Sequence, residues 1–168
     1  YLEAREAFGT AVRTTSLDEL ARAEALATRA VASDPAHAAA LGLRGLVEDV
    51  RGEHIKAELQ YRAAAEQAPD EPQFTANHAR ALLDTGRAAE ALPRFQRVSQ
   101  RYTLAAVEQA LAHWALGQWD AALESQTHAV ERLRQPSLSG VPAEGYVWTF
   151  FPAPGEVVSL GGAERRCY

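Results

Sequence analysis

Apolar residues recur about every 3.6 positions along residues 36–134, the spacing that places them on one face of an α-helix. Gly52, Gly86 and Gly117 interrupt this pattern, and glycine readily adopts the left-handed conformation in which many helices end. The pattern therefore predicts six helices separated by short turns, at about 36–50, 53–67, 72–85, 88–101, 104–116 and 119–134.

Two further helices are predicted before residue 36. Ser16-Leu17-Asp18-Glu19 fits a capping box, in which the Ser16 side chain accepts from the helix start and Glu19 reaches back. This motif predicts a helix over 17–33, ended by Asp34-Pro35, with residues 2–13 as its partner helix.

A spacing of 34 residues relates positions in successive helix pairs: Pro35 and Pro69, Gly52 and Gly86, Ala57 and Ala91, Tyr61 and Phe95. Two sets of small residues step together by 34, 34 and 31: Ala11, Gly45, Ala79 and Ala110, and Ala23, Ala57, Ala91 and Ala122. Small residues that face each other let two helix axes approach to about 8 Å. A period of this length indicates one helical unit stacked on copies of itself.

The residues of this pattern resemble the tetratricopeptide repeat (TPR) family. The best-matching unit contains Leu41, Gly45, Gly52, Ala57, Tyr61, Ala64 and Pro69. The resemblance covers about residues 4–135, roughly four units. It implies an all-α fold, a right-handed solenoid of antiparallel helix pairs.

Four positions depart from the family pattern. Arg44 and His78 stand where the family usually has leucine, so these two sites are expected either to be wetter or to have polar partners. Gln126 replaces an aromatic residue, which weakens the contact of the last helix with anything beyond it. Pro93 removes one backbone hydrogen bond inside a helix and is predicted to bend it.

The sequence changes character after residue 135, so we predict a helical repeat domain at 1–135 and a C-terminal extension at 136–168. Residues 136–142 have the composition of a loop. Residues 146–151 are aromatic and β-branched and predict a strand, and 156–160 predict a returning strand of a short hairpin. This extension is expected to dock on the helices, to pair with another chain in a homo-oligomer, or to begin a region that is cut short.

Composition excludes several classes of protein. The chain has 168 residues, a formal net charge of −5 and a pI near 5.6, which argues against a nucleic-acid binder. No apolar run approaches the roughly 18 residues of a membrane helix, so no membrane span is predicted. Abundant alanine and arginine are typical of GC-rich bacterial genomes. The compartment stays open: the cytoplasm is favoured, and a cleaved signal peptide would leave no trace.

The sequence contains no motif typical of an enzyme, and we predict no cofactor. The five histidines lack metal-ligand spacing, and neither a nucleophile elbow nor a phosphate-binding loop is present. His78 and His113 are close enough in the repeat to meet across adjacent helices, although a satisfied polar residue is the favoured interpretation for each. The chain contains one cysteine, Cys167, so it forms no internal disulfide.

The resemblance implies a binding surface, because in this family the first helix of each unit lines the concave face. The positions that correspond here are Leu43, Leu46, Val50, Asn77, Arg80, Asp84, Glu108, Leu111 and Trp114. The expected ligand is a peptide or protein segment. Leu46, Leu111 and Trp114 are the predicted anchors, Asn77 a hydrogen-bonding group, and Arg80 a partner for a carboxylate.

The predicted function is a non-catalytic adaptor or assembly scaffold that binds protein. Two alternatives remain open at this point: a regulatory or substrate-recruiting arm of a larger enzyme or receptor, and a self-associating structural module. The concave face itself is either a ligand groove, a solvated surface, or a surface filled by the extension.

Overall fold

The computed structural model describes residues 1–134, 157–160 and 163–166, and its helices confirm the predicted all-α solenoid. The helices are α1 (Leu2–Thr14), α2 (Leu17–Ser33), α3 (Ala38–Val50), α4 (His54–Gln67), α5 (Pro72–Asp84), α6 (Ala88–Val98), α7 (Thr103–Ala115) and α8 (Trp119–Arg134). The largest difference from the predicted bounds is at α6, which ends at Val98 instead of residue 101.

The three glycine turns have the same geometry, which explains why the pattern breaks at a constant place in the unit. Gly52, Gly86 and Gly117 have φ values of 79°, 79° and 71°, in the left-handed region that disfavours a side chain. In each turn the next N–H donates to a carbonyl five residues earlier: Glu53 to Glu48, Arg87 to Leu82, and Gln118 to His113. Such bonds satisfy carbonyls that the helix end would leave unpaired.

The start of α2 confirms one half of the predicted capping box. The Glu19 backbone N–H donates to Ser16 Oγ at 3.3 Å, as expected for an N-cap serine. The predicted return bond is replaced, because the Ser16 N–H donates to the Ala11 carbonyl at 3.1 Å. The Ala11 carbonyl, near the end of α1, therefore accepts from the Ser16 N–H in place of the Glu19 side chain.

Small residues bring the helices of each pair together. A Cβ built on Gly45 would lie 2.6 Å from Tyr61 Cε1, so the Tyr61 ring rests directly on the glycine backbone. The remaining members of the two small-residue sets are buried, except Ala122, which is half-buried. Phe95 is fully buried in a cluster with residues of α5, α6 and α7, where it fills the space between successive helix pairs.

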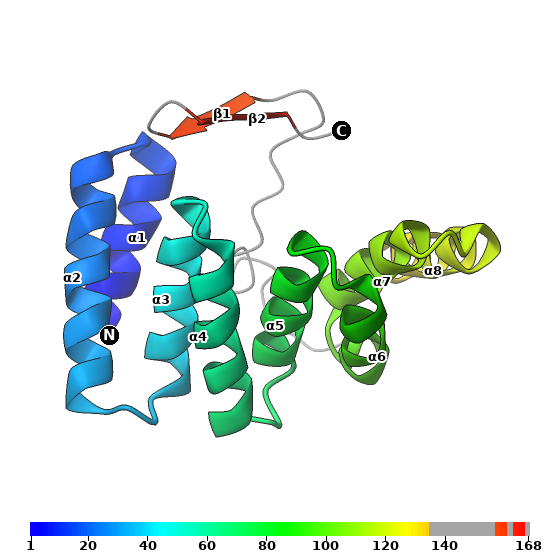
Figure 1. Ribbon diagram of the computed structural model, residues 1–168, viewed down its shortest axis with the longest axis horizontal. Coiled ribbons are helices and arrows are strands. Elements are labelled where there is room, and N and C mark those ends of the chain that lie inside the picture. The colour runs from blue at the N-terminus through cyan, green and yellow to red at the C-terminus, as the bar shows by residue number, and fades with distance from the viewer. Residues whose placement is uncertain (135–156, 161–162, 167–168) are drawn as a thin grey trace.

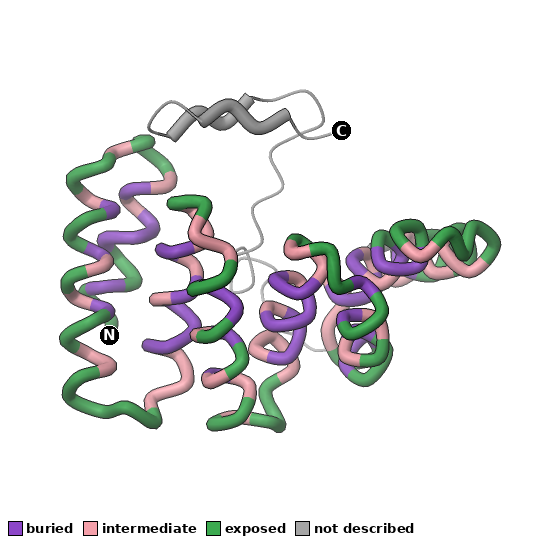
Figure 2. Tube along the Cα trace, in the orientation of Figure 1, coloured by how far each residue is buried: buried purple, intermediate pink, exposed green. Residues whose placement is uncertain are grey.

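The helix pairs follow one another in a curved row (Figure 1). Helices α1, α3, α5 and α7 contact one another in order along one side of the row. The axes turn progressively from nearly upright at α1 to nearly horizontal at α8 in this view (Figure 1). Buried residues concentrate where neighbouring helices face each other, and exposed residues lie on the outer surfaces (Figure 2).

The two polar departures from the family pattern have polar partners, which is one of the two expected outcomes. Arg44 Nε lies 3.2 Å from Glu48 Oε1, and His78 Nε2 lies 3.3 Å from Glu58 Oε1 in a buried pair. Burial, followed by the nearby Arg94 charge, lowers the pKa of His78. Pro93 lies inside α6, and the predicted bend stays a prediction.

The C-terminal extension contains one antiparallel strand pair among the described residues. Strands β1 (Val157–Leu160) and β2 (Ala163–Arg166) pair with Val157 opposite Arg166 and Leu160 opposite Ala163. The predicted returning strand at 156–160 thus corresponds to β1, whose partner is β2. The predicted strand at 146–151 and Cys167 lie outside the described residues. The domain boundary at residues 135/136 stays a prediction.

Candidate functional site

An open pocket of about 270 Å³ lies on the side of the row formed by α1, α3 and α5. Its walls are mainly apolar and aromatic: Tyr1, Arg5, Ala39, Gly42, Leu43, Leu46, Gln73, Phe74, Asn77 and Tyr102. This volume is slightly below the roughly 300–1,000 Å³ typical of small-molecule sites. The pocket can therefore take one or two side chains of a larger ligand.

Three of the nine predicted groove residues line this pocket: Leu43, Leu46 and Asn77. The sequence did not predict Phe74, which forms a wall because Gly42 has no side chain. A Cβ on Gly42 would lie 3.1 Å from Phe74 Cε1, so the aromatic ring lies against the α3 backbone. The available signal was Gly42 itself, a second glycine in α3 that does not belong to the two sets of small residues.

Asn77 is the polar group best placed to contact a ligand. It is half-buried on α5, with the leucines of α3 and the Phe74 ring lining the same pocket. Within the described part of the chain, its side-chain amide forms no hydrogen bond to protein. An asparagine amide can donate two hydrogen bonds and accept more, so its bonding capacity is available at this surface.

Arg80, Asp84 and Glu108 form a separate ionic cluster between α5 and α7. Arg80 Nη1 lies 2.9 Å from Glu108 Oε1, and Arg80 Nε lies 3.1 Å from Asp84 Oδ2. Glu108 is 1% exposed. Burial raises the pKa of Glu108 to about 7, although the Arg80 charge opposes this effect. Burial lowers the pKa of Arg80, but the Asp84 and Glu108 carboxylates together outweigh it and raise that pKa above its usual range.

This cluster changes what Arg80 can offer a ligand. Its guanidinium already pairs with two carboxylates of the chain, so a ligand carboxylate would have to compete with them. The predicted contact between Arg80 and a ligand stays a prediction. Removing Arg80 would also leave the buried Glu108 carboxyl group without its hydrogen-bond donor, which is costly.

The other predicted residues lie outside the pocket lining. Val50 is half-buried and packs against the core formed by α1, α2 and α3. Leu111 and Trp114 are 43% and 63% exposed on α7. The Trp114 and Trp119 rings are 6.0 Å apart between centroids, with an interplanar angle of 73°. We call the exposed residues Leu111, Trp114, Trp119 and Leu123 the tryptophan patch.

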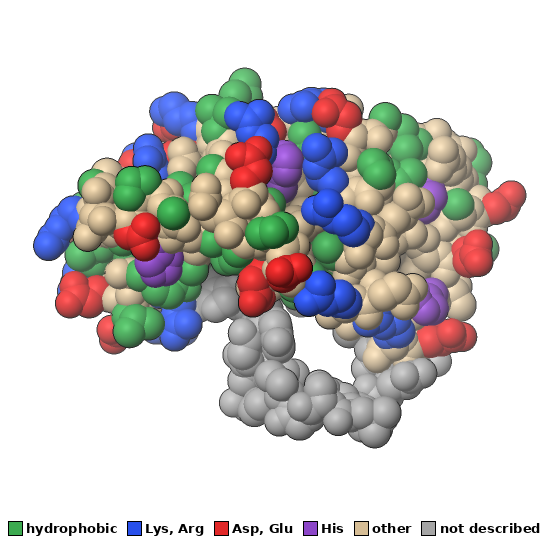
Figure 3. Space-filling view, turned by 90° about the horizontal axis from the view of Figure 1, so that it is seen from below, with side chains coloured by type: hydrophobic (Ala, Val, Ile, Leu, Met, Phe, Trp, Pro, Cys, Tyr) green, Lys and Arg blue, Asp and Glu red, His purple; other side chains and the backbone are tan. Residues whose placement is uncertain are grey.

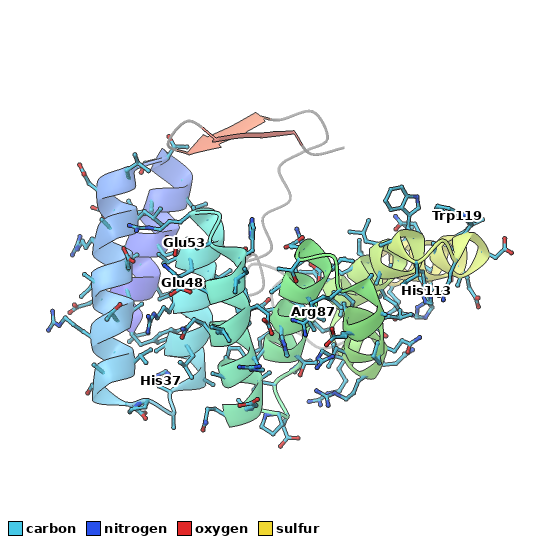
Figure 4. All side chains as sticks on the ribbon, viewed as in Figure 1. His37, Glu48, Glu53, Arg87, His113 and Trp119 are labelled. Carbon is cyan, nitrogen blue, oxygen red and sulfur yellow. The ribbon has the colours of Figure 1, made fainter. Side chains whose placement is uncertain are left out.

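The tryptophan patch lies on α7 and α8, outside the pocket, whose lining runs from Tyr1 to Tyr102 just before α7. The His37 ring packs 5.1 Å from the ring of Tyr1, a pocket residue, and Figure 4 places His37 near the α1–α3 end. The same view places Trp119 at the far end, beside α7 and α8. The predicted groove residues therefore divide among a pocket, an ionic cluster and a distant apolar patch.

The repeat architecture agrees with comparisons against known proteins. The family model described as "Tetratricopeptide repeat" matches residues 16–72 and 77–135, more than half of the chain. The chain belongs to the tetratricopeptide repeat family. No curated protein matches the chain.

Solved TPR structures share this fold at low sequence identity. One is described as "YrrB: a TPR protein with an unusual peptide-binding site", with a TM-score of 0.61 and 22% identity. The match covers 75% of this chain and 66% of that chain. MamA (MSR-1) has a TM-score of 0.59 and MamA (AMB-1) 0.57, each at 22% identity and 72% coverage of this chain. These matches cover 70% and 71% of the MamA chains.

The TPR fold is that of a protein–protein interaction module, and proteins of this family are typically non-catalytic. His78 pairs with Glu58, and His113 Nδ1 lies 2.7 Å from Gln118 Oε1, so each histidine has a structural partner of its own. In the described ranges, no three His, Cys, Asp or Glu side chains group as a metal site. No helix of the described residues is long and apolar enough to cross a membrane.

A second hollow of about 400 Å³ lies between α1 and α2. Its lining includes Glu3, Leu26 and Arg29, and it contains none of the predicted groove residues. Although it is larger, it lies between the two helices of the first pair, away from α3 and α5. We therefore place the candidate site at the pocket that contains Asn77.

Proposed function

We propose that this TPR protein is an adaptor or assembly scaffold that holds an extended segment of a partner protein in the pocket of α1, α3 and α5. The observation that carries the proposal is the half-buried amide of Asn77 among apolar walls. An extended peptide has unpaired backbone N–H and C=O groups, and the Asn77 amide can bond both.

The apolar walls supply the second part of the interaction. Leu43, Leu46 and Phe74 form a surface that would take one large apolar side chain of the segment. Burial of such a side chain contributes roughly 1.5–3 kcal/mol, while the amide bonds add direction. A few anchors of this kind commonly dominate the energy of an interface. The described peptide-binding site of YrrB, a protein of the same fold, is consistent with this proposal.

Selection from a random peptide library displayed on phage, followed by fluorescence anisotropy with the selected peptides, tests the proposal. Asn77→Ala and Leu46→Ala should each weaken binding about tenfold, from lost hydrogen bonds and lost apolar contact. Gln67→Ala removes an exposed amide at the end of α4 and serves as the matched control. Peptides that bind all four proteins equally would show that the pocket is not the binding site.

The tryptophan patch favours self-association as a second candidate function. Two exposed tryptophans and two exposed leucines on neighbouring helices are unusual on a surface that contacts only water. Trp114→Ala combined with Trp119→Ala should lower the solution mass measured by light scattering at high protein concentration. Ile55→Ala with Leu59→Ala removes exposed apolar groups of α4 as a control. A mass that stays monomeric at every concentration would exclude this second function.

A further inference from the structure

Four arginines gather around the C-terminal end of α6, and we call them the arginine strip: Arg94, Arg97, Arg101 and Arg132. Arg94 and Arg97 lie three residues apart on one side of α6, and Arg101 lies in the turn that follows the end of the helix at Val98. Arg132 reaches the same place from α8, because it donates to the carbonyls of Ser99 and Gln100. A band of Lys and Arg side chains is visible over the region of α5 and α6 in Figure 3.

Each guanidinium of the strip donates to a neutral acceptor, although the Glu90 carboxylate, which pairs with Arg87, also interacts electrostatically with Arg94. The bonds run from Arg94 to the Glu90 carbonyl (2.5 Å), Arg97 to Thr75 Oγ1 (3.1 Å), Arg101 to the Asp70 carbonyl (2.9 Å) and Arg132 to the Gln100 carbonyl (2.9 Å). A guanidinium has five N–H donors, so most donors of the strip stay available. The side chains are thus held in place without a direct ion pair to a described carboxylate.

This arrangement differs from that of five of the nine arginines earlier in the chain. Five of those arginines form ion pairs with carboxylates: Arg22, Arg44, Arg51, Arg80 and Arg87. No described carboxylate pairs with a member of the strip. Residues 91–107 contain three arginines and no acidic residue. A chain with a formal charge of −5 therefore carries a local positive surface.

We propose that the arginine strip binds an acidic segment of a partner protein. The planar guanidinium matches a carboxylate through two parallel hydrogen bonds, and fixed side chains lose less conformational entropy on binding. A short acidic segment can bind the strip without contacting the negatively charged remainder of the surface. Nucleic acids and anionic membranes carry charge over a larger area, and the net negative charge of the chain opposes them. This surface is separate from the Asn77 pocket and does not depend on it.

Binding of a dye-labelled deca-glutamate peptide, measured by fluorescence anisotropy at low and high salt, tests the proposal. Arg97→Glu with Arg101→Glu should weaken binding about tenfold, because attraction is replaced by repulsion at two sites. Arg13→Glu with Arg29→Glu changes the net charge equally on α1 and α2 and should leave binding nearly unchanged. Asn77→Ala should also have no effect, which separates this surface from the pocket.

Circular dichroism establishes whether the double variant is folded. If it is unfolded, Arg101→Gln replaces it, because Arg101 contacts only an exposed carbonyl, and a loss of about threefold is expected. Absence of binding to the wild-type chain, or equal loss in both double variants, would overturn the proposal. Tighter binding to a single-stranded oligonucleotide or to phosphatidylserine vesicles would overturn the assignment to a protein partner.

Discussion

The buried carboxyl group of Glu108 makes the stability of this protein depend on pH in a direction that can be tested. Burial raises the pKa of Glu108 to about 7 in the folded chain, against 4.5 when it is solvated. At a pH between these two pKa values, Glu108 keeps its proton in the folded chain and loses it in the unfolded chain. The contribution of Glu108 to the free energy of unfolding is therefore fully present below pH 4.5 and is lost as the pH rises through 7.

The size of the effect follows from the two pKa values. Their difference, at about 1.36 kcal/mol per pH unit, corresponds to on the order of 3 kcal/mol in the free energy of unfolding. Glu108→Gln keeps an oxygen that can accept from Arg80 but cannot titrate. The difference in unfolding free energy between wild type and this variant should therefore fall by about that amount from pH 4.5 to pH 8.

Urea unfolding followed by circular dichroism, at several pH values for both proteins, measures this difference. The comparison is needed because the lowered pKa of His78 contributes a slope of opposite sign, present in both proteins. Glu66→Gln, at an exposed carboxylate of α4, is the control and should track the wild type. A difference between wild type and Glu108→Gln that is constant with pH, or that grows as the pH rises, would refute the reasoning.

Three further predictions concern packing, titration and capping. Gly45→Ala should lower the free energy of unfolding by about 1–3 kcal/mol in urea, because the new methyl group meets the Tyr61 ring; an unchanged midpoint would contradict the close contact. In an NMR titration, the midpoint of the His78 protonation should lie below pH 6.5, and Arg94→Gln should move this midpoint upward. A midpoint that does not rise in this variant would exclude the Arg94 charge as a cause of the lowered pKa. Ser16→Ala should cost about 1 kcal/mol in the same urea assay through loss of the N-cap, and a neutral result would count against that hydrogen bond.

The helices and turns could be predicted because they depend on nearby residues. Apolar spacing determines which face of a helix is buried, and glycine permits the left-handed turn at residues 52, 86 and 117. Close contacts between helices were also foreseeable, because the small residues repeat with the unit. The end of α6 was placed three residues too late, because the Arg101 N–H donates to the Val98 carbonyl in a tight turn, while Arg132 of α8, a residue distant in sequence, donates to the Ser99 and Gln100 carbonyls.

The candidate site was predicted less completely, for a physical reason. Position within the repeat identifies which residues face the inner side of the row, and this placed Leu43, Leu46 and Asn77 in one pocket. It does not identify the partner that each long side chain finds. Arg80 pairs with Glu108, a residue 28 positions later, and that choice depends on how α5 and α7 approach each other.

The sequence by itself thus determined the repeat, the helix pairs and the family, because these follow from local periodicity and from small residues at constant spacing. The tertiary structure alone decided how the predicted groove residues divide among a pocket, an ionic cluster and an exposed patch. The rotation between successive helix pairs sets the distances between these residues. That rotation results from many packing contacts between residues far apart in the chain, such as Phe95 between α5, α6 and α7.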